Sequence, residues 1–328
     1  MAKPDDPLWD PQLGGDDELE HLELLLGRYG VAARGLILRV PAAPARAPRR
    51  RLRFAAIAAC AAALFALAGF AYRLAWSDGA AWRVSGGALT RIAPGDVLRA
   101  GAGASLTIDV ARIGRITLSP ASTLRLVETR SGHHRVALDS GHLRARIWAP
   151  PGYFGVSDTS AEIVDLGCDF DVWKQADGRG RVFVRSGWII HRTDTGEVLV
   201  PAGYAVEFDA QRASTPLRPE ADAAFAQAVA RLDASLDAPG TADVTAAEAV
   251  ASAATDADAY TLLSLLSRYP ALARTALYPR LAHAFKETGD DAHRAAWTAG
   301  DPAAIDAWWR HLPTSPKRWW LNWPDVFG

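Results

Sequence analysis

One stretch of this sequence, Phe54–Tyr72, runs for nineteen residues without a charged side chain. An α-helix rises about 1.5 Å per residue, so roughly 20 apolar residues cross the ~30 Å hydrocarbon core of a bilayer. Leu74 and Trp76 extend the apolar character past Arg73, whose long side chain can reach the lipid–water interface. The stretch therefore predicts a transmembrane helix over residues 53–75.

The charges that flank this stretch predict which side of the membrane each end occupies. Four arginines lie within residues 49–53, immediately before the stretch, whereas only Arg73 and Arg83 follow it closely. Because Lys and Arg next to a spanning helix stay on the cytoplasmic side, we expect a cytoplasmic N-terminus and an external remainder. An Ala-rich core helix of a soluble protein is the alternative, since ten of the nineteen residues are alanine. A cleaved signal peptide is disfavoured because such segments begin near residue 1.

The segment before the predicted spanning helix, residues 1–50, is short and divided by charge. Residues 1–23 contain eight acidic residues and one lysine, whereas residues 24–53 contain eight arginines and no acid. Residues 16–29 predict one amphipathic helix with an aspartate cap, followed by a linker rich in Pro, Ala and Arg. So short a helix is marginal alone in water, so we expect it to bind a cytoplasmic protein. Its candidate contact face comprises Leu19, Leu22, Leu26 and Tyr29.

Residues 80–212 change to a period of two, which is typical of half-buried β-strands. Leu106, Ile108 and Val110, for example, alternate with polar residues. Glycine-containing turns recur between such runs, including one at residues 139–141. Alternating strands separated by frequent turns predict an antiparallel β-sandwich or a jelly-roll-like domain.

Residues 217–328 return to a helical period and predict a small α-helical bundle. Thr245 and Glu248 have the spacing of a capping box, and Asp301 followed by Pro302 is a typical helix start. The whole chain is thus predicted to be a multi-domain α+β protein with one N-terminal transmembrane helix.

The C-terminal region is unusually rich in tryptophan, since six of the chain's twelve lie in the last 32 residues. Trp319, Trp320 and Trp323 follow the last predicted helix and show no regular period. They are the candidate contacts with a glycan, an envelope protein or the membrane. The alternative is that they fold back onto the helices or the β domain, because large aromatic side chains are seldom left uncovered.

The composition points away from several kinds of chemistry. A net charge of −1 offers no global basic surface for nucleic acid. Two cysteines are too few for a zinc cluster or a disulfide framework. Cys168 alternates with Phe170 and Val172, which predicts a buried structural thiol. We therefore expect no catalytic residues, no metal and no cofactor, and a protein that is not an enzyme.

Two polar clusters were the strongest candidates for a metal ion. His133, His134 and His142 could approach one another across a hairpin closed near residue 140 and hold zinc, although histidines near turns are more often solvated. Asp169 and Asp171 share the polar side of one predicted strand. We expect both carboxylates to face solvent, and a calcium site is disfavoured because calcium takes its ligands from loops.

After a strand entry at Gly101–Asp109, several further short motifs of the β region follow one another as far as Gly203. They are Gly114–Leu124, Val136–Leu143 with its central Gly141, the strand motif Gly167, Cys168, Phe170 and Val172, and the later glycines Gly187 and Gly203. In this order they resemble the FecR-like domain of membrane-anchored bacterial regulators. Cys168 stands where that family usually has threonine.

The resemblance implies an envelope-facing domain that takes part in signal transduction and transcription regulation. It also implies that the chain is anchored in the inner membrane of a bacterium, with its bulk in the periplasm. Family members act as anti-sigma factors, which implies a sigma factor as the protein partner. This chain departs from them in its cytoplasmic segment, which is shorter than their sigma-binding domain.

Three functional hypotheses follow, of different classes. The first, which we favour, is a membrane regulator that passes an envelope signal to a cytoplasmic partner. The second is an envelope scaffold that binds glycan or another envelope protein, with the N-terminus as an anchor only. The third is an enzyme with a jelly-roll core and a bound metal. Fold analogy alone does not decide among them.

Overall fold

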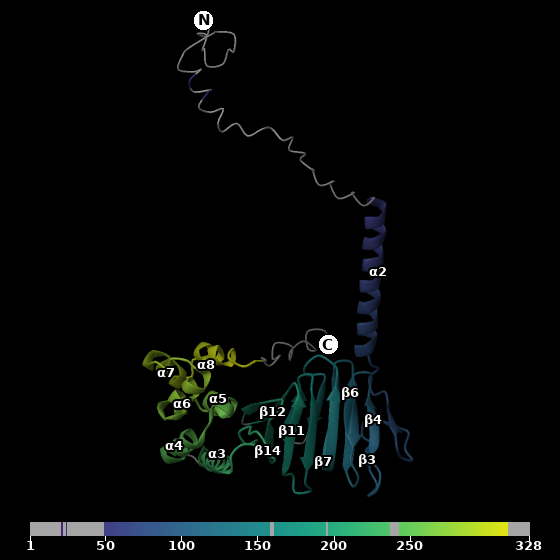
Figure 1. The fold of residues 1–328 in the computed structure, drawn as a ribbon. Helices are drawn as coiled ribbons and strands as arrows, with labels where there is room; N and C mark the ends of the chain where they lie inside the picture. Colours follow the sequence, from purple (N-terminus) through teal and green to yellow (C-terminus); the bar gives the residue numbers. More distant parts are fainter. Residues whose placement is uncertain are drawn as a thin grey trace. The chain divides into compact units, whose positions relative to one another are not determined.

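The computed structural model describes His21, Leu24 and residues 49–157, 161–194, 196–236 and 243–313 (Figure 1). Two compact units divide the chain, residues 1–63 and residues 64–328. The predicted amphipathic helix at 16–29 and the aromatic tail lie outside the described residues, apart from His21 and Leu24. The predicted domain boundaries within residues 80–328 stay a prediction.

In the part of the chain that the structure describes, one long apolar helix, α2 (Arg49–Leu74), precedes the β region. Its window Ile57–Leu74 has a mean hydropathy of 1.8, and none of that window is buried. Phe65, for example, is 80% exposed. By length and composition the helix is able to cross a membrane, as the sequence predicts, and its exposure argues against the alternative of a buried core helix.

The β region contains fourteen strands among the described residues. They are β1 (Trp82–Ser85), β2 (Arg91–Ile92), β3 (Val97–Arg99), β4 (Leu106–Val110), β5 (Gly114–Leu118), β6 (Thr123–Arg130), β7 (His133–Ile147), β8 (Phe154–Ser157), β9 (Ala161–Asp165), β10 (Asp169–Lys174), β11 (Gly180–Ser186), β12 (Trp188–Thr193), β13 (Gly196–Pro201) and β14 (Ala205–Phe208). The first sheet has the order β2-β1-β4-β5-β7-β10-β11-β14, and the second has the order β3-β6-β7-β8-β9-β12-β13. All pairs are antiparallel except β7 with β8, which confirms the predicted fold class.

The core of the β region comes from side chains that alternate along these strands. In β4, Leu106, Ile108 and Val110 are buried, whereas the two intervening residues are half-exposed. Phe154 of the second sheet and Phe170 of the first meet in the core with ring centroids 6.4 Å apart. The period of two thus places one face of each strand in a shared hydrophobic core.

Glycines mark the places where the chain passes from one sheet to the other. Gly141, Gly167, Gly187 and Gly203 all have positive φ, between 78° and 100°. A Cβ on Gly141 would lie 2.2 Å from Ser122 Oγ, so only glycine fits there. The glycines that carry the family resemblance are therefore the corners of the sandwich.

The predicted turn at residues 139–141 is wrong in kind. β7 continues without interruption from His133 to Ile147. Its first half pairs with β6 and β8, and its second half pairs with β5 and β10. A glycine in the left-handed region bends a strand as readily as it closes a hairpin, and local sequence does not distinguish the two.

Helices follow the β region, as predicted. They are α3 (Ala223–Leu236), α4 (Val244–Ala253), the 3₁₀ turn η2 (Asp256–Asp258), α5 (Ala259–Arg268), the 3₁₀ turn η3 (Pro270–Arg274), α6 (Leu277–Phe285), α7 (Asp291–Thr298) and α8 (Pro302–Trp309). The start of α8 is confirmed, since the Asp301 side chain accepts a hydrogen bond from Ala303 N. The capping box at Thr245 is wrong, because Asp243 caps α4 instead.

Tyr260 is a central residue in the packing of the helices on the second sheet, together with Trp309 and Leu312. The Tyr260 hydroxyl of α5 donates to the Leu199 carbonyl of β13 over 2.5 Å. Its ring contacts Trp188, Tyr204 and Trp309, with centroids 4.8–6.0 Å apart. A fully buried tyrosine with a satisfied hydroxyl joins the two regions by both packing and polarity.

Candidate functional site

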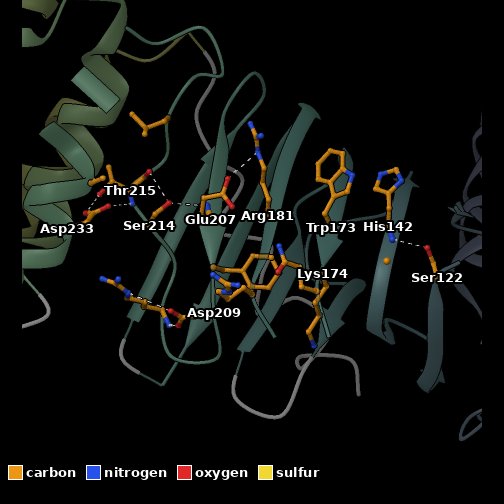
Figure 2. A pocket seen from close by; sticks show the side chains of 18 of the residues that line it. Ser122, His142, Trp173, Lys174, Arg181, Glu207, Asp209, Ser214, Thr215 and Asp233 are labelled. Atoms are coloured by element: carbon orange, nitrogen blue, oxygen red, sulfur yellow. Dashed lines mark hydrogen bonds and ion pairs between the residues drawn. The ribbon is translucent and has the colours of Figure 1, made fainter. Parts of the chain in front are cut away.

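A groove of about 1010 Å³ lies between the edge of the first sheet and α3 (Figure 2). Strands β10, β11 and β14 form its floor, and α3 borders it with residues that include Asp233. In Figure 2, His142 and Trp173 lie toward one end, and Thr215 and Asp233 lie toward the other.

Aromatic side chains build one end of the groove. The rings of His142 and Trp173 stack with centroids 4.7 Å apart and planes 15° apart. Both rings come from the outer face of the first sheet, where His142 of β7 is the register partner of Trp173 of β10. Trp173 is 39% exposed, so it offers a flat platform for a sugar ring or a planar side chain.

A buried carboxylate holds the histidine in place. Asp171 accepts from His142 Nε2 at 2.9 Å and from Arg185 Nε. Burial acts to raise the pKa of Asp171, but the hydrogen bonds from His142 and Arg185 lower it below its ordinary value. The expectation that Asp171 faces solvent is therefore wrong. The residue is on the outer face as alternation predicts, but its two partners cover it.

Ser119, His142 and Asp171 form a continuous hydrogen-bonded chain, because Ser119 Oγ lies 2.7 Å from His142 Nδ1. Nucleophilic hydrolases use these residue types, together with N–H donors that stabilise an oxyanion. Here the Ser119 amide N–H already donates to the His142 carbonyl at 3.0 Å. The chain of bonds fixes the ring of His142, and the expectation that the protein is not an enzyme stays a prediction.

The opposite end of the groove ties α3 to the sheet. Thr215 donates its amide N–H and its hydroxyl to the two carboxylate oxygens of Asp233, at 2.8 and 2.6 Å. Between the two ends, Arg181 and Glu207 form an exposed ion pair at 3.5 Å. Burial raises the pKa of Glu207, although Arg181 opposes that shift. With an aromatic platform and paired charges, the groove suits a polar ligand or a peptide.

Cys168 is buried, as its alternation with Phe170 predicts. Asp165, which is also buried, accepts hydrogen bonds from the Cys168 amide N–H at 2.8 Å and from its thiol. Burial raises the pKa of Asp165 to about 7 and raises that of the Cys168 thiol well above its ordinary value. A thiol so protonated is a structural donor and a poor nucleophile.

The three histidines considered as zinc ligands each contact a different partner. His133 contacts Glu128, His134 is buried against Thr129, and His142 contacts Asp171. In the part of the chain that the structure describes, no group of three or more His, Cys, Asp or Glu side chains is placed to hold a metal ion.

The residues of both predicted contact faces lie outside the described residues. These are Leu19, Leu22, Leu26, Tyr29, Trp319, Trp320 and Trp323. The described motif residues have structural positions. Phe170 and Val172 are in the core, and the four glycines form the corners between the sheets.

A set of contacts at the end of α2, here called the joint, was not predicted from the sequence. Trp76 N donates to Ser131 Oγ at 2.7 Å, and Ser131 Oγ donates to the Trp76 carbonyl at 2.9 Å. Arg112 donates to the carbonyls of Tyr72 and Ala75 at 3.0 and 2.8 Å. The last turn of the apolar helix is thus bonded directly to the β region. In the sequence, only the presence of an arginine at position 112 is consistent with these contacts, because arginine side chains hydrogen-bond the last carbonyls of helices.

Comparisons with known proteins give a distant likeness. No family model and no curated protein matches this chain. Two crystal structures of an inferred anti-sigma factor from Parabacteroides distasonis ATCC 8503 match it with 18% identity and a TM-score of 0.33. The match covers 40% of this chain and 63% of that one, so this chain spans less than two thirds of the protein it resembles.

Proposed function

We propose that this protein is a single-pass membrane regulator that carries an envelope signal to a cytoplasmic partner. In this proposal the β region and the helices lie in the periplasm, and residues 1–50 bind a cytoplasmic protein such as a sigma factor. One observation carries the proposal: an exposed helix able to cross a membrane is bonded at its end to a folded sandwich.

The exposure of α2 is the physical reason to place it in lipid. Phe65, Leu67 and Phe70 are each more than half exposed. Apolar surface left in water costs about 25 cal/mol for each Å², and a bilayer removes that cost along the whole helix. The arginines at positions 49–53 then favour a cytoplasmic N-terminus.

The joint supports transmission between the two sides. A signal that displaces the β region acts on the helix only if the two are mechanically connected. The hydrogen bonds of Ser131 and Arg112 to the backbone of Tyr72, Ala75 and Trp76 supply that connection. A flexible linker in the same place would absorb the displacement.

The groove favours a second candidate function, an envelope scaffold. Its platform at Trp173 and its ion pair suit a glycan or a peptide of another envelope protein. In that case residues 1–50 serve as an anchor only. The two candidates differ in whether the N-terminal segment has a partner.

A topology and binding experiment tests the proposal. Alkaline phosphatase fused after Gly328 is active only outside the cytoplasm, so we expect activity in intact cells. The full chain is then purified after cross-linking, alongside a variant in which Leu19, Leu22 and Leu26 are changed to Ala. We expect a cytoplasmic protein to be enriched with the wild type and lost with the variant. An inactive fusion overturns the membrane topology, and an active fusion with no N-terminal partner favours the scaffold.

A further inference from the structure

A second cavity, of about 580 Å³, lies at the joint. Tyr72, Arg73 and Trp76 line it from the end of α2 and the residues that follow. Arg83, Arg91 and Arg112 line it from the β region. The cavity therefore collects four arginines around the end of a helix that is able to cross a membrane.

The charge of this cavity is strongly unbalanced. Asp109 is the acidic residue of its lining, and it is shared between Arg83 at 4.0 Å and Arg115 at 3.3 Å. Among the described residues, Arg91 and Arg112 take part in no ion pair. Arg112 donates to backbone carbonyls instead. Positive charge that outnumbers the nearby carboxylates in this way is the environment of an anion-binding site.

Aromatic rings lie beside one of these arginines, Arg112. The Arg112 guanidinium lies 4.0 Å from the Tyr72 ring centroid and 5.3 Å from that of Trp76. Trp148 also lines the cavity and is 54% exposed, and its amide N–H donates to the carbonyl of Ile113, the residue after Arg112. Tyr and Trp concentrate at the membrane–water interface, where one end of the ring is in lipid and the other in water.

The position of the cavity indicates which kind of anion lies within its reach. If Ile57–Leu74 crosses the bilayer, Tyr72 and Trp76 lie at its outer interface, at the depth of the lipid headgroups. Arginines are normally depleted on the outer side of a spanning helix. Four of them at one cavity therefore indicate that a negatively charged group binds there. A phosphodiester within reach is supplied by the surrounding lipid.

We propose that this cavity binds the headgroup phosphate of an anionic phospholipid from the outer leaflet of the inner membrane. The inference rests on the proposed membrane topology. Arg83 and Arg91 contribute side-chain donors that match phosphate oxygens, and Arg112 contributes positive charge beside the helix end. A bound lipid contacts both α2 and the strands, so it stabilises the joint.

Lipid retention by the full chain tests this inference. The protein is inserted into nanodiscs with equal amounts of phosphatidylglycerol and phosphatidylcholine, and retained lipids are counted by native mass spectrometry. We expect the wild type to retain phosphatidylglycerol preferentially. We expect R83Q/R91Q to reduce that preference by about fivefold for each arginine removed. The control R125Q/R192Q removes two partly exposed, ion-paired arginines that line neither this cavity nor the groove, and we expect it to behave as the wild type.

Each contrary result has one meaning. Equal retention of the two lipids by the wild type, or an equal loss in both double variants, overturns the lipid site. Displacement of the retained lipid by millimolar inorganic phosphate overturns the lipid as its occupant and leaves a phosphate site. Extraction of the chain from membranes by alkaline carbonate tests insertion separately. A chain that is extracted refutes the proposed topology, whereas an inserted chain without lipid preference refutes this inference alone.

Discussion

At the scale of single residues, the β region buries titratable groups whose neutral forms suit its core. His134 is fully buried, and its Nδ1 lies 2.8 Å from the Thr129 hydroxyl, which also accepts from Trp82 Nε1. Its Nε2 is buried without a hydrogen-bond partner in the described part of the chain. Burial, followed by the charge of Arg135, lowers the pKa of His134 to about 3.

His134 therefore links stability to pH. The folded-state pKa lies below the ordinary value of 6.5, so the neutral ring stabilises the fold fully above pH 6.5, and that contribution falls as the pH decreases toward 3. The loss is about 1.4 kcal/mol for each pH unit. We expect the difference in free energy of unfolding between the wild type and H134Q to shrink by about 2 kcal/mol from pH 6.5 to pH 5, measured by urea denaturation in detergent. The variant H283Q, at an exposed histidine, is the control. A difference between the wild type and H134Q that stays constant with pH would contradict a buried neutral ring.

Cys168 gives a second residue-scale prediction. Its thiol donates to the buried Asp165, which is what a threonine hydroxyl at this position would do. We expect C168T to keep the unfolding free energy within about 1 kcal/mol of the wild type. We expect C168A to lose about 1–2 kcal/mol, because it deprives a buried carboxyl of one donor. Thermal denaturation of both variants checks this, and equal stability of the two would show that the hydrogen bond contributes nothing.

At the scale of elements, alternation predicts strands well because it depends on neighbours in the chain. The buried positions of β4 and β10 follow directly from their period of two. The bend of β7 at Gly141 could not be predicted, since it depends on the approach of Ser122 from another segment. The same reason explains the error at Asp171, whose partners His142 and Arg185 come from two other strands.

The corner at Gly141 leads to a prediction with a matched control. Gly141 and Gly178 have similar positive φ values, 100° and 88°. A Cβ at Gly141 would meet Ser122, whereas a Cβ at Gly178 meets no atom within 4 Å. We expect G178A to cost about 1 kcal/mol from backbone strain alone and G141A to cost at least about 3 kcal/mol. Urea denaturation measures both, and similar costs would mean that the corner relaxes without loss.

At the scale of the whole molecule, the parts that matter for the proposed function are joined by contacts that no local pattern encodes. The apolar helix and the sandwich were each predictable, because hydropathy and alternation are properties of contiguous residues. The groove and the joint were not, since the joint pairs Trp76 with Ser131, which are 55 positions apart. Predicting either requires the register of the sheets first.

The connection at the joint should therefore weaken when Ser131 is replaced, although the β region remains folded. Ser131 Oγ makes two hydrogen bonds to the backbone of Trp76, and each contributes about 1 kcal/mol. We expect S131A to increase the rate of amide hydrogen exchange at Trp76 by about 30-fold, while the core strands keep their protection. Ser85 supplies the control, since its hydroxyl makes one 3.4 Å bond to Thr107 within the sheet, and S85A should leave Trp76 unchanged. Unaltered exchange in S131A would mean that other contacts hold the helix. If exchange is faster but the envelope signal still reaches the cytoplasmic partner, the signal does not travel through this connection.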